Sequence, residues 1–579
     1  MRHLIAYLIP FCRQYRFYFI SGFLLILLTN SCAWIIPQYI KHVINHLNIA
    51  SNEAFINPAL FWIITLTVIK CIGLFGSRKI LINASRHIEF DIRNQLFGHL
   101  LKLPLAYYHR VRTGDLMSRL TNDLESIRSV MGPGLMYSLT TLTLLIFVVP
   151  ALLQISPSLT LFSCIPVLGI PFVVRKIALS IHHQYFKVQQ TLGALTSLVQ
   201  ENFSGILLIK SAGLIENEKK RFANLNQQNL EQNIRLGQIY GLFYPGIMFL
   251  VGLGTVLFLG WGGYGVMSGR MDLGSFVAFH VYLGMLMQPL GALGWALNLF
   301  QRGTASWLRL QSILNEPHDQ SQSLIISPFP SLAAGTLEIR NLHFQFINNG
   351  FSLKNITLKI PLRKKIAIIG PTGSGKTSLL NLLARLYPAP SRTIFLNGID
   401  LNQLAESSFR KSICQVPQDS FVFADLIKNN ISYPDFSLPQ IIIEAAARQA
   451  SLDDEIHGFP EKFEQEVGER GITLSGGQRQ RTTLARAFSK NPEILLLDDC
   501  LSSVDAATEH TILTALNEQF TDLTLIMVSH RLSSIQNFDK IFVLDHGQLI
   551  EEGTHPELMS QHGLYQRTFM IQQLEKELI

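Results

Sequence analysis

The segment from Ile494 to Asp505, ILLLDDCLSSVD, joins a run of aliphatic residues to two adjacent aspartates. The aliphatic run predicts a buried strand. A carboxylate at the end of such a strand suits Mg²⁺, which prefers oxygen ligands, and we assign that metal-binding role to Asp498. The function of the second acid, Asp499, depends on what the rest of the chain binds.

A loop upstream predicts the binding of a nucleotide's phosphates. The segment GPTGSGKT follows the apolar segment KKIAIIG and precedes an amphipathic helical pattern. Its glycines let backbone N–H groups surround a phosphate chain beside the positive start of the helix. Lys376 then reaches the β- and γ-phosphates, and Thr377 is a ligand of Mg²⁺. The predicted nucleotide-binding residues of this loop are Gly370, Pro371, Thr372, Gly373, Ser374, Gly375, Lys376 and Thr377.

A third segment, LSGGQRQRTTLARAF, lies just before the aliphatic run. Ser475, Gly476 and Gly477 can present a hydroxyl and backbone amides at the start of a helix, where anions bind. One nucleotide site does not need two such helix starts in one domain. Two domains that face each other head to tail would use both, with each ATP between one chain's phosphate loop and the other chain's LSGGQ segment.

The elements that position these residues form a C-terminal α/β domain. The segments TLEIRNLHFQF and SLKNITLKI alternate apolar and polar residues as strands do. Before them, residues 313–335 are polar and contain prolines, which is typical of a linker. We therefore place a nucleotide-binding P-loop ATPase domain at residues 336–579.

The first half of the chain predicts helices that span a membrane. The chain is 48% hydrophobic and only 15% charged, and nearly all of its long apolar segments lie in this half. A bilayer core needs about 20 mostly apolar residues per helix. We therefore assign residues 1–312 to an all-α transmembrane domain of six helices. The predicted segments are Phe17–Ile40, Ile56–Phe75, Val130–Ile155, Leu159–Val174, Ile239–Met267 and Leu273–Phe300.

Basic residues predict the orientation of these helices. They concentrate in the two long loops, after the second and the fourth apolar segments, and this bias places both loops and both termini in the cytoplasm. The expected location is therefore the inner (cytoplasmic) membrane. The loops have helical periodicity, so the helices should continue beyond the bilayer. These loops also account for the net charge of +7, and no nucleic acid is expected as a partner.

Three further sequence patterns concern the cysteines, one turn and the N-terminal segment. The six cysteines form no CxxC pair or metal-binding spacing and are expected to be reduced thiols. Ser156–Ser158 alone separates the third apolar segment from the fourth, which predicts a tight turn at one membrane face. No cleavable signal peptide is expected, because the first apolar segment lacks a small-residue cleavage site.

Taken in order, these motifs resemble those of an ABC exporter half-transporter over essentially the whole chain. The phosphate loop corresponds to Walker A, Leu474–Gln478 to the signature and Ser502–Asp505 to the D-loop. Three further segments resemble the family's two cytoplasmic loops and its cross-contacting loop. These are Arg112–Arg128, Gln200–Gly213 and Glu466–Gly471.

The resemblance implies ATP and Mg²⁺ as cofactors and a second half-transporter as partner. It implies that Gln418 is the Q-loop glutamine, which joins Thr377 and Asp498 around the metal. It also implies catalytic roles for Asp499, Gln418 and the switch histidine His530. The signature residues Ser475, Gly476, Gly477 and Gln478 would bind the nucleotide held by the partner's Walker loop.

Two positions depart from the family pattern. Phe346 stands where a tyrosine normally stacks on adenine, and a phenyl face still stacks; the alternative is an ordinary strand aromatic. Asp499 stands where a glutamate usually orients or deprotonates the attacking water. Its carboxylate is withdrawn by roughly 1.5 Å, and a misplacement of about 1 Å can cost about 10²-fold in rate. We therefore expect weak hydrolysis at this chain's Walker site; the alternative is that Asp499 acts through one extra water. With its intact LSGGQ segment, the chain resembles the aspartate-bearing subunit of bacterial heterodimeric multidrug-resistance-like ABC exporters, and this resemblance implies a heterodimer whose partner supplies the glutamate.

The substrate is predicted by family analogy alone to be an amphipathic drug or lipid. Lys70 is an ionisable residue within an apolar segment, so it either contacts substrate or snorkels to the interface. Trp261, Tyr264, His280 and Gln288 either line a cavity or pack helices together. Two other functions stay open, namely a homodimeric lipid flippase and an ATP-regulated channel or regulatory membrane protein.

Overall fold

The computed structural model describes residues 2–47, 53–318, 330, 332, 335–345 and 352–577. Contacts within the chain divide it into two compact units. The first holds residues 1–101 and 113–315, and the second holds residues 102–112 and 316–579. The predicted fold class is confirmed, because helices fill the first unit and an α/β domain fills the second. The domain boundaries at residues 312 and 335 stay predictions.

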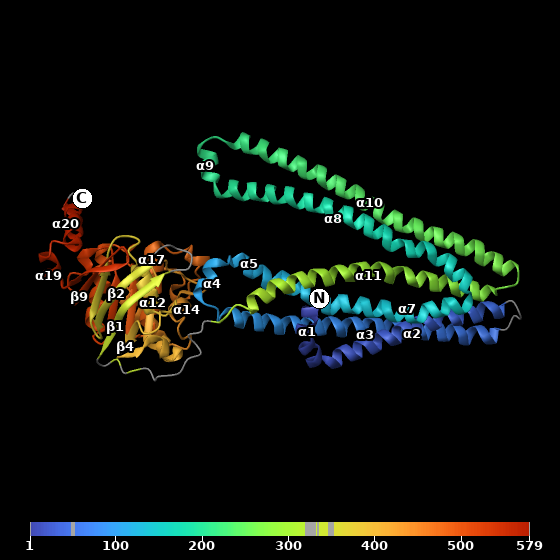
Figure 1. Ribbon diagram of the computed structural model, residues 1–579, viewed down its shortest axis with the longest axis horizontal. Helices are drawn as coiled ribbons and strands as arrows, with labels where there is room; N and C mark the ends of the chain where they lie inside the picture. The colour runs from blue at the N-terminus through green and yellow to red at the C-terminus, as the bar shows by residue number, and fades with distance from the viewer. Residues whose placement is uncertain are drawn as a thin grey trace. The chain divides into compact units, whose positions relative to one another are not determined.

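Long helices make up the first unit (Figure 1). The six predicted membrane segments lie in α2, α3, η2 with α7, α8, α10 and α11. Two π-helical turns, η1 and η2, separate the short helices that precede α7. The bounds are α1 Arg2–Gln14, α2 Arg16–Leu47, α3 Glu53–Leu100, α5 Thr113–Ser118, η1 Arg119–Asp123, α6 Leu124–Ser129, η2 Val130–Gly134, α7 Leu135–Ile155, α8 Pro157–Ser204, α9 Ile206–Ser211, α10 Ile215–Met267 and α11 Leu273–Leu314.

Four stretches of the described helices are long and apolar enough to cross a membrane, and they match the first, second, third and fifth predicted segments. They are Arg16–His46, Asn57–Leu100, Thr113–Ile155 and Met248–Met267. The sixth segment contains a shorter described apolar stretch, Leu273–Leu286. In the fourth and sixth segments, the side chains of residues 170–175 and 287–291 lie outside the described residues. The chain is therefore a multi-pass membrane protein.

The turn between α7 and α8 follows from its sequence. Ser156 is the N-cap of α8, and its hydroxyl accepts a hydrogen bond from the Leu159 N–H at 3.3 Å. Pro157 takes the first helical position, where a missing N–H costs nothing. The tight turn predicted at Ser156–Ser158 is confirmed. Beyond it, α8 and α10 pack side by side and are joined through α9 (Figure 1).

Two buried acids in the helical unit are paired with arginines. Asp123 is 5% exposed and accepts a hydrogen bond from the Nε of Arg309 at 2.9 Å. Glu89, also buried, accepts from Arg86 at 2.9 Å and from Arg93. Removing one partner of a buried ion pair leaves an uncompensated charge. These pairs therefore tie α3 internally and connect η1 to α11.

Two sheets form the framework of the second unit. A four-stranded antiparallel sheet has the order β2-β1-β4-β5, and a six-stranded sheet has the order β10-β9-β3-β8-β7-β6. Strands β9, β3, β8, β7 and β6 are parallel, and β10 pairs antiparallel with β9. The bounds are β1 Thr336–Gln345, β2 Ser352–Pro361, β3 Lys365–Ile369, β4 Ile394–Leu396, β5 Ile399–Asp400, β6 Ile413–Val416, β7 Ile494–Asp498, β8 Thr524–Val528, β9 Lys540–Asp545 and β10 Gln548–Gly553.

Helices and short turns pack against these sheets. The short helix α4 (Leu105–Arg110) also belongs to this unit, and its His109 ring stacks on Tyr387 with ring centroids 6.4 Å apart. The remaining bounds are α12 Lys376–Leu383, η4 Leu401–Gln403, α13 Glu406–Ser412, α14 Ile427–Ile431, α15 Gln440–Gln449, α16 Asp453–Gly458, η5 Lys462–Glu464, η6 Glu469–Gly471, α17 Gly476–Ser489, α18 Ala506–Gln519, η7 Leu532–Ser534, α19 His555–Ser560 and α20 Leu564–Glu577.

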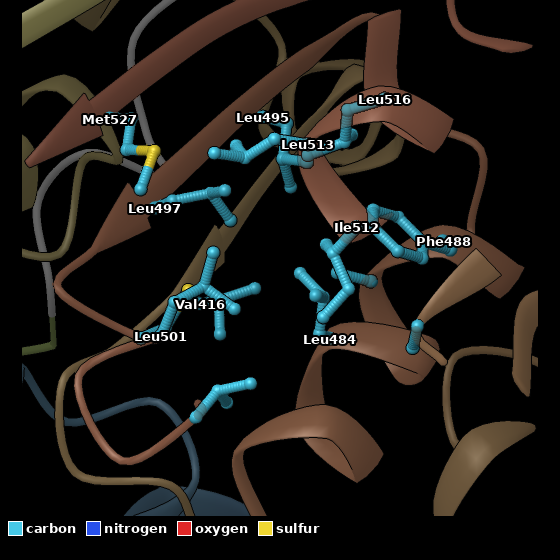
Figure 2. Close-up of a cluster of buried hydrophobic side chains, with 14 of the residues drawn as sticks. Val416, Leu484, Phe488, Leu495, Leu497, Leu501, Ile512, Leu513, Leu516 and Met527 are labelled. Carbon is cyan, nitrogen blue, oxygen red and sulfur yellow. The ribbon is translucent and has the colours of Figure 1, made fainter. Parts of the chain in front are cut away.

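The central sheet is buried on both faces, as parallel sheets usually are. Every residue of β7 and of β8 is buried. Figure 2 shows one side of this core, where Leu495, Leu497 and Met527 from the strands face Leu484 and Phe488 of α17. This core holds the strands in place. The strands in turn position the polar residues that lie at their carboxyl ends.

Candidate functional site

Neighbouring parallel strands deliver the predicted site residues to one edge of the sheet. Parallel pairing places Ile368 beside Val528 and Val528 beside Asp498. The phosphate loop follows β3, His530 follows β8, Asp499 follows β7 and Gln418 follows β6. Ligands of open α/β sheets bind outside the carboxyl ends of the strands. The sheet therefore brings together segments separated by more than 100 residues.

The phosphate loop turns sharply because its glycines adopt left-handed or extended conformations that other residues disfavour. Gly370 has φ 148°, Gly373 has φ 81° and Gly375 has φ 103°. A Cβ atom at Gly370 would lie 1.9 Å from the carbonyl oxygen of Leu544. Only glycine fits there, and α12 begins directly after Gly375.

Lys376 is held inside this loop. Its side chain is buried, and Nζ donates to the carbonyl oxygens of Gly370 at 2.8 Å and Pro371 at 2.9 Å. Burial lowers the pKa of Lys376, while the nearby carboxylates of Asp498 and Asp499 act in the opposite direction. A phosphate oxygen could replace the carbonyl acceptors because an ammonium has three donors that rotate freely.

Asp498 and Thr377 meet across the site. The Thr377 hydroxyl donates to Oδ1 of Asp498 at 3.2 Å, and Asp498 is 2% exposed. Burial raises the pKa of Asp498, and the Thr377 hydrogen bond opposes that shift. Hydroxyl and carboxylate oxygens are hard donors that fit Mg²⁺, which keeps the rest of its coordination for waters and phosphates. The two side chains therefore fit the metal that the sequence predicts.

Asp499 has a backbone conformation that its neighbours do not share. Its φ is +45°, in the left-handed region, where aspartate and asparagine are the most tolerated residues after glycine. Its N–H donates to the Val528 carbonyl at 3.0 Å. Burial raises the pKa of Asp499, whereas His530 lowers it.

A cavity of about 390 Å³ unites most of the predicted residues. Ser378 and Val528 also line it and were not predicted. Gly370, Pro371 and Ser374 belong to the loop but are not part of this lining. Phe346 lies outside the described residues, so its adenine contact stays a prediction. The lining consists of Thr372, Gly373, Gly375, Lys376, Thr377, Ser378, Gln418, Asp498, Asp499, Val528 and His530.

The signature segment does not line this cavity in the described part of the chain. Ser475 is the N-cap of α17, and its hydroxyl accepts from the Gln478 N–H at 3.2 Å. The Gln478 side chain accepts from the Ser475 N–H at 2.8 Å and donates to Glu455 at 2.8 Å. Gln478 therefore closes a capping box, a structural role that the sequence analysis did not assign to it.

The glycine pair of the signature packs against the D-loop. A Cβ atom at Gly477 would lie 3.1 Å from the carbonyl oxygen of Ser503. Gln480, one turn further along α17, also binds the D-loop, since its Oε1 accepts from the Ser503 N–H at 2.9 Å. Sequence analysis missed Gln480, because the sequence does not indicate which loop faces α17.

Of the membrane residues named in the sequence analysis, two pack against aromatic rings and two others are exposed or half-buried. Trp261 packs on Phe162 with ring centroids 4.8 Å apart, and the His280 ring stacks on Phe258 at 5.3 Å. Tyr264 is exposed and Lys70 is half-buried. The side chain of Gln288 lies outside the described residues. Substrate contact by any of these residues stays a prediction.

Comparison with known families identifies both parts of the chain. Residues 19–290 match the family described as ABC transporter transmembrane region, and residues 353–502 match the family described as ABC transporter. The chain therefore belongs to the ABC transporter family, as a half-transporter with its transmembrane region and its ATPase domain on one chain. It is an ABC transporter ATPase, and ATP is the nucleotide that such a domain binds.

Individual relatives are similar over most of the chain. The multidrug resistance-like ATP-binding protein MdlA of Escherichia coli is 33% identical over 527 residues, which cover 90% of this chain and 88% of that protein. An ATP-dependent lipid A-core flippase of Syntrophus aciditrophicus is 33% identical over 490 residues, 84% of this chain and 81% of its own length. The structure of a bacterial Atm1-family ABC exporter with ATP bound has a TM-score of 0.78 at 24% identity and covers 96% of this chain and 98% of its own.

Proposed function

We propose that this chain is one half of a heterodimeric ABC exporter and that its own Walker site binds Mg·ATP but hydrolyses it slowly. Asp499 is the observation that supports this proposal. Its side chain is one methylene shorter than glutamate, and its backbone has a φ of +45°. A carboxylate held back in this way is poorly placed to orient water on the γ-phosphate.

In this proposal, binding at the site comes from the phosphate loop and its neighbours. Lys376 exchanges its loop carbonyls for β- and γ-phosphate oxygens, and the N–H groups at the start of α12 face the same phosphates. Asp498, Thr377 and Gln418 would hold Mg²⁺, which would neutralise charge on the phosphates. His530 contacts the γ-phosphate. Water attacks the γ-phosphorus in line with the leaving β-phosphate oxygen, and positioning and charge stabilisation supply most of the rate.

The partner subunit supplies what this chain's site lacks. Ser475, Gly476 and Gly477 start a helix that is outside this chain's own cavity. They would close on the ATP that the partner holds, whose Walker B glutamate makes that second site the productive one. Closure and separation of the two ATPase domains then drive the membrane helices between inward and outward openings.

The transported molecule is an amphipathic drug or lipid, and the chain lies in the inner membrane with both termini in the cytoplasm. The similarity to a multidrug resistance-like protein supports the first substrate class. A homodimeric lipid flippase is the second candidate function, and the 33% identity to a lipid A-core flippase supports it. The two candidates differ in whether this chain alone makes two working sites.

Turnover of the lone chain tests the proposal. The chain is purified in detergent and its ATPase rate is measured with and without the partner half-transporter. We expect weak turnover alone and a large rise with the partner. Asp499→Glu in the lone chain should raise turnover by about tenfold or more, because the carboxylate advances toward the water. A matched Asp522→Glu variant, at an exposed surface position, should change nothing.

A stable homodimer of the unaltered chain that turns over ATP at about 1 s⁻¹ or faster, a rate usual for enzymes, would contradict the heterodimer. That result would favour the flippase. Failure of Asp499→Glu to raise the rate would show that the length of this side chain does not limit hydrolysis.

A further inference from the structure

A glutamine in the C-terminal helix holds the main chain of the switch segment, Ser529–Leu532. Gln572 lies in α20, 42 residues after His530. Its Nε2 donates to the carbonyl oxygen of His530 at 2.7 Å, and its Oε1 accepts from the N–H of Leu532 at 2.9 Å. Both ends of one side-chain amide are therefore used on the two residues that flank Arg531.

The helix that presents Gln572 is anchored in the core. Tyr565 is fully buried and Phe569 is 8% exposed, and both belong to the hydrophobic core of the ATPase unit. With Gln572 they follow the i, i+4, i+7 spacing of one helical face. Glu551 caps the start of the helix by accepting from the N–H groups of Leu564 and Tyr565. The amide of Gln572 is therefore presented from a fixed position.

The opposite side of the switch segment is held by a buried charge. Glu509 of α18 is 3% exposed and pairs with the Arg531 guanidinium, which also donates to the D-loop carbonyls of Val504 at 2.9 Å and Ser502 at 3.2 Å. The segment thus lies between α18 and α20. His530 lines the nucleotide cavity, and its carbonyl oxygen accepts a hydrogen bond from Gln572 of α20.

We propose that Gln572 is a positioning residue for His530. By fixing the main chain on both sides of Arg531, it sets the direction in which the imidazole enters the nucleotide cavity. Loss of the two hydrogen bonds lets the segment shift, so His530 meets the γ-phosphate less often in the right geometry. This inference rests on the proposed function, in which His530 contacts the γ-phosphate. The effect therefore falls on ATP and spares ADP, which has no γ-phosphate.

The test measures the preference for a γ-phosphate in the full-length chain. Affinities for Mg·AMP-PNP and Mg·ADP are measured on the purified chain, and their ratio is compared between variants. Gln572→Met keeps the length and helix propensity of the side chain but removes both hydrogen bonds. It should reduce the ratio roughly threefold, and His530→Ala should reduce it about tenfold, as expected for a hydrogen bond to a charged group. Gln573→Met, at the exposed neighbouring glutamine, should leave the ratio unchanged.

The double variant separates positioning from general weakening. Because Gln572 acts through His530, adding Gln572→Met to His530→Ala should have no further effect on the ratio. The inference alone is overturned if His530→Ala lowers the ratio and Gln572→Met does not, or if Gln572→Met weakens both nucleotides equally. If His530→Ala itself leaves the ratio unchanged, the proposed role of the histidine is wrong and this inference falls with it.

Discussion

Two helices of the ATPase unit start at anion-binding sequences, yet their first turns differ. α12 follows Gly375, and in the described part of the chain no side chain caps its first turn. α17 follows Ser475, and the reciprocal hydrogen bonds between Ser475 and Gln478 close its first turn. The first helix start lines the cavity that holds the carboxylate pair, whereas the second lies apart from it.

In the proposed function, this difference distinguishes a complete nucleotide site at α12 from a surface at α17 that contributes to the partner's site. The uncapped N–H groups at the start of α12 are available to a ligand that binds in the phosphate loop before this helix. At α17 the Gln478 N–H is already satisfied, so the groups left for an anion are the Ser475 hydroxyl and the glycine N–H groups. Such a surface costs little to leave exposed to water, because water satisfies the free groups of a helix start.

The largest expected effect comes from disrupting α17. Ser475→Ala with Gly477→Asp removes donors to the partner's ATP and places a carboxylate beside the Ser503 carbonyl. Loss of one preorganised donor to developing charge typically costs about 10²–10³ in rate, so transport by the assembled pair should nearly stop. Nucleotide binding to the lone chain should be unchanged, as measured by equilibrium titration.

Its matched control is Ser437→Ala with Gly458→Asp, a serine and a glycine elsewhere in the same domain. A Cβ atom at Gly458 meets nothing within 4 Å. That variant should transport normally. Normal transport in the signature variant as well would contradict the proposed role of α17 at the partner's ATP.

Disrupting α12 should act on binding instead. Lys376→Ala removes a direct contact to the phosphates, and hydrogen bonds to charged groups contribute about 1.5–3 kcal/mol. The dissociation constant of the lone chain for Mg·ATP should rise roughly 10- to 100-fold. Lys359→Ala, on β2 and paired with Glu338 at 3.0 Å, is the control and should bind normally. Unaltered binding by Lys376→Ala would place the phosphates elsewhere.

A smaller effect, on turnover, is expected from a change at Asp499. In the proposed function this residue limits hydrolysis but not nucleotide binding. Asp499→Asn keeps the shape and the tolerance for positive φ, and the site is proposed to hydrolyse weakly already. Turnover of the assembled transporter should change by less than about threefold. Asp498→Asn is the contrasting variant, which should weaken Mg²⁺-dependent binding. Complete loss of activity in Asp499→Asn would mean that this aspartate is a working base.

The most local effect concerns the cap itself. Ser475→Ala alone removes the acceptor of the Gln478 N–H, and loss of an N-cap costs about 1 kcal/mol. Hydrogen exchange at that amide should therefore quicken about fivefold when local opening governs it. Ser437→Ala should leave exchange at Gln478 unaltered. Unaltered exchange in Ser475→Ala would mean that the capping box does not protect this turn in solution.

The sequence predicted the fold well where the pattern is local. Apolar segments of membrane length, the serine before Pro157 and the glycines of the phosphate loop each determine their own short stretch of backbone. The predicted helical domain followed by an α/β ATPase is confirmed. The sheet also brings together Lys376, Asp498 and His530, because Asp498 ends β7, His530 lies just after β8 and the loop that leads to Lys376 follows β3.

Contacts between distant segments could not be predicted in the same way. The hydrogen bonds of Gln572 to the switch segment and of Gln480 to the D-loop depend on which helix packs beside which loop. Glutamine in a polar helical pattern is ordinary, so its type gives no signal. Asp499 directly follows β7 and has a positive φ, a conformation that its residue type tolerates but does not by itself predict.

The length of the membrane helices has a mechanical consequence. α3 and α8 each have 48 residues and α10 has 53, and at a rise of about 1.5 Å per residue a helix of this size is about 72 Å long. A rotation of about 5° at one end moves the other by about 6 Å, close to one helical turn. Because α8 and α10 lie side by side, each stiffens the other against bending. The pair therefore acts as a lever arm. A rotation at one end that is too small to disturb the local packing produces a large displacement at the other end.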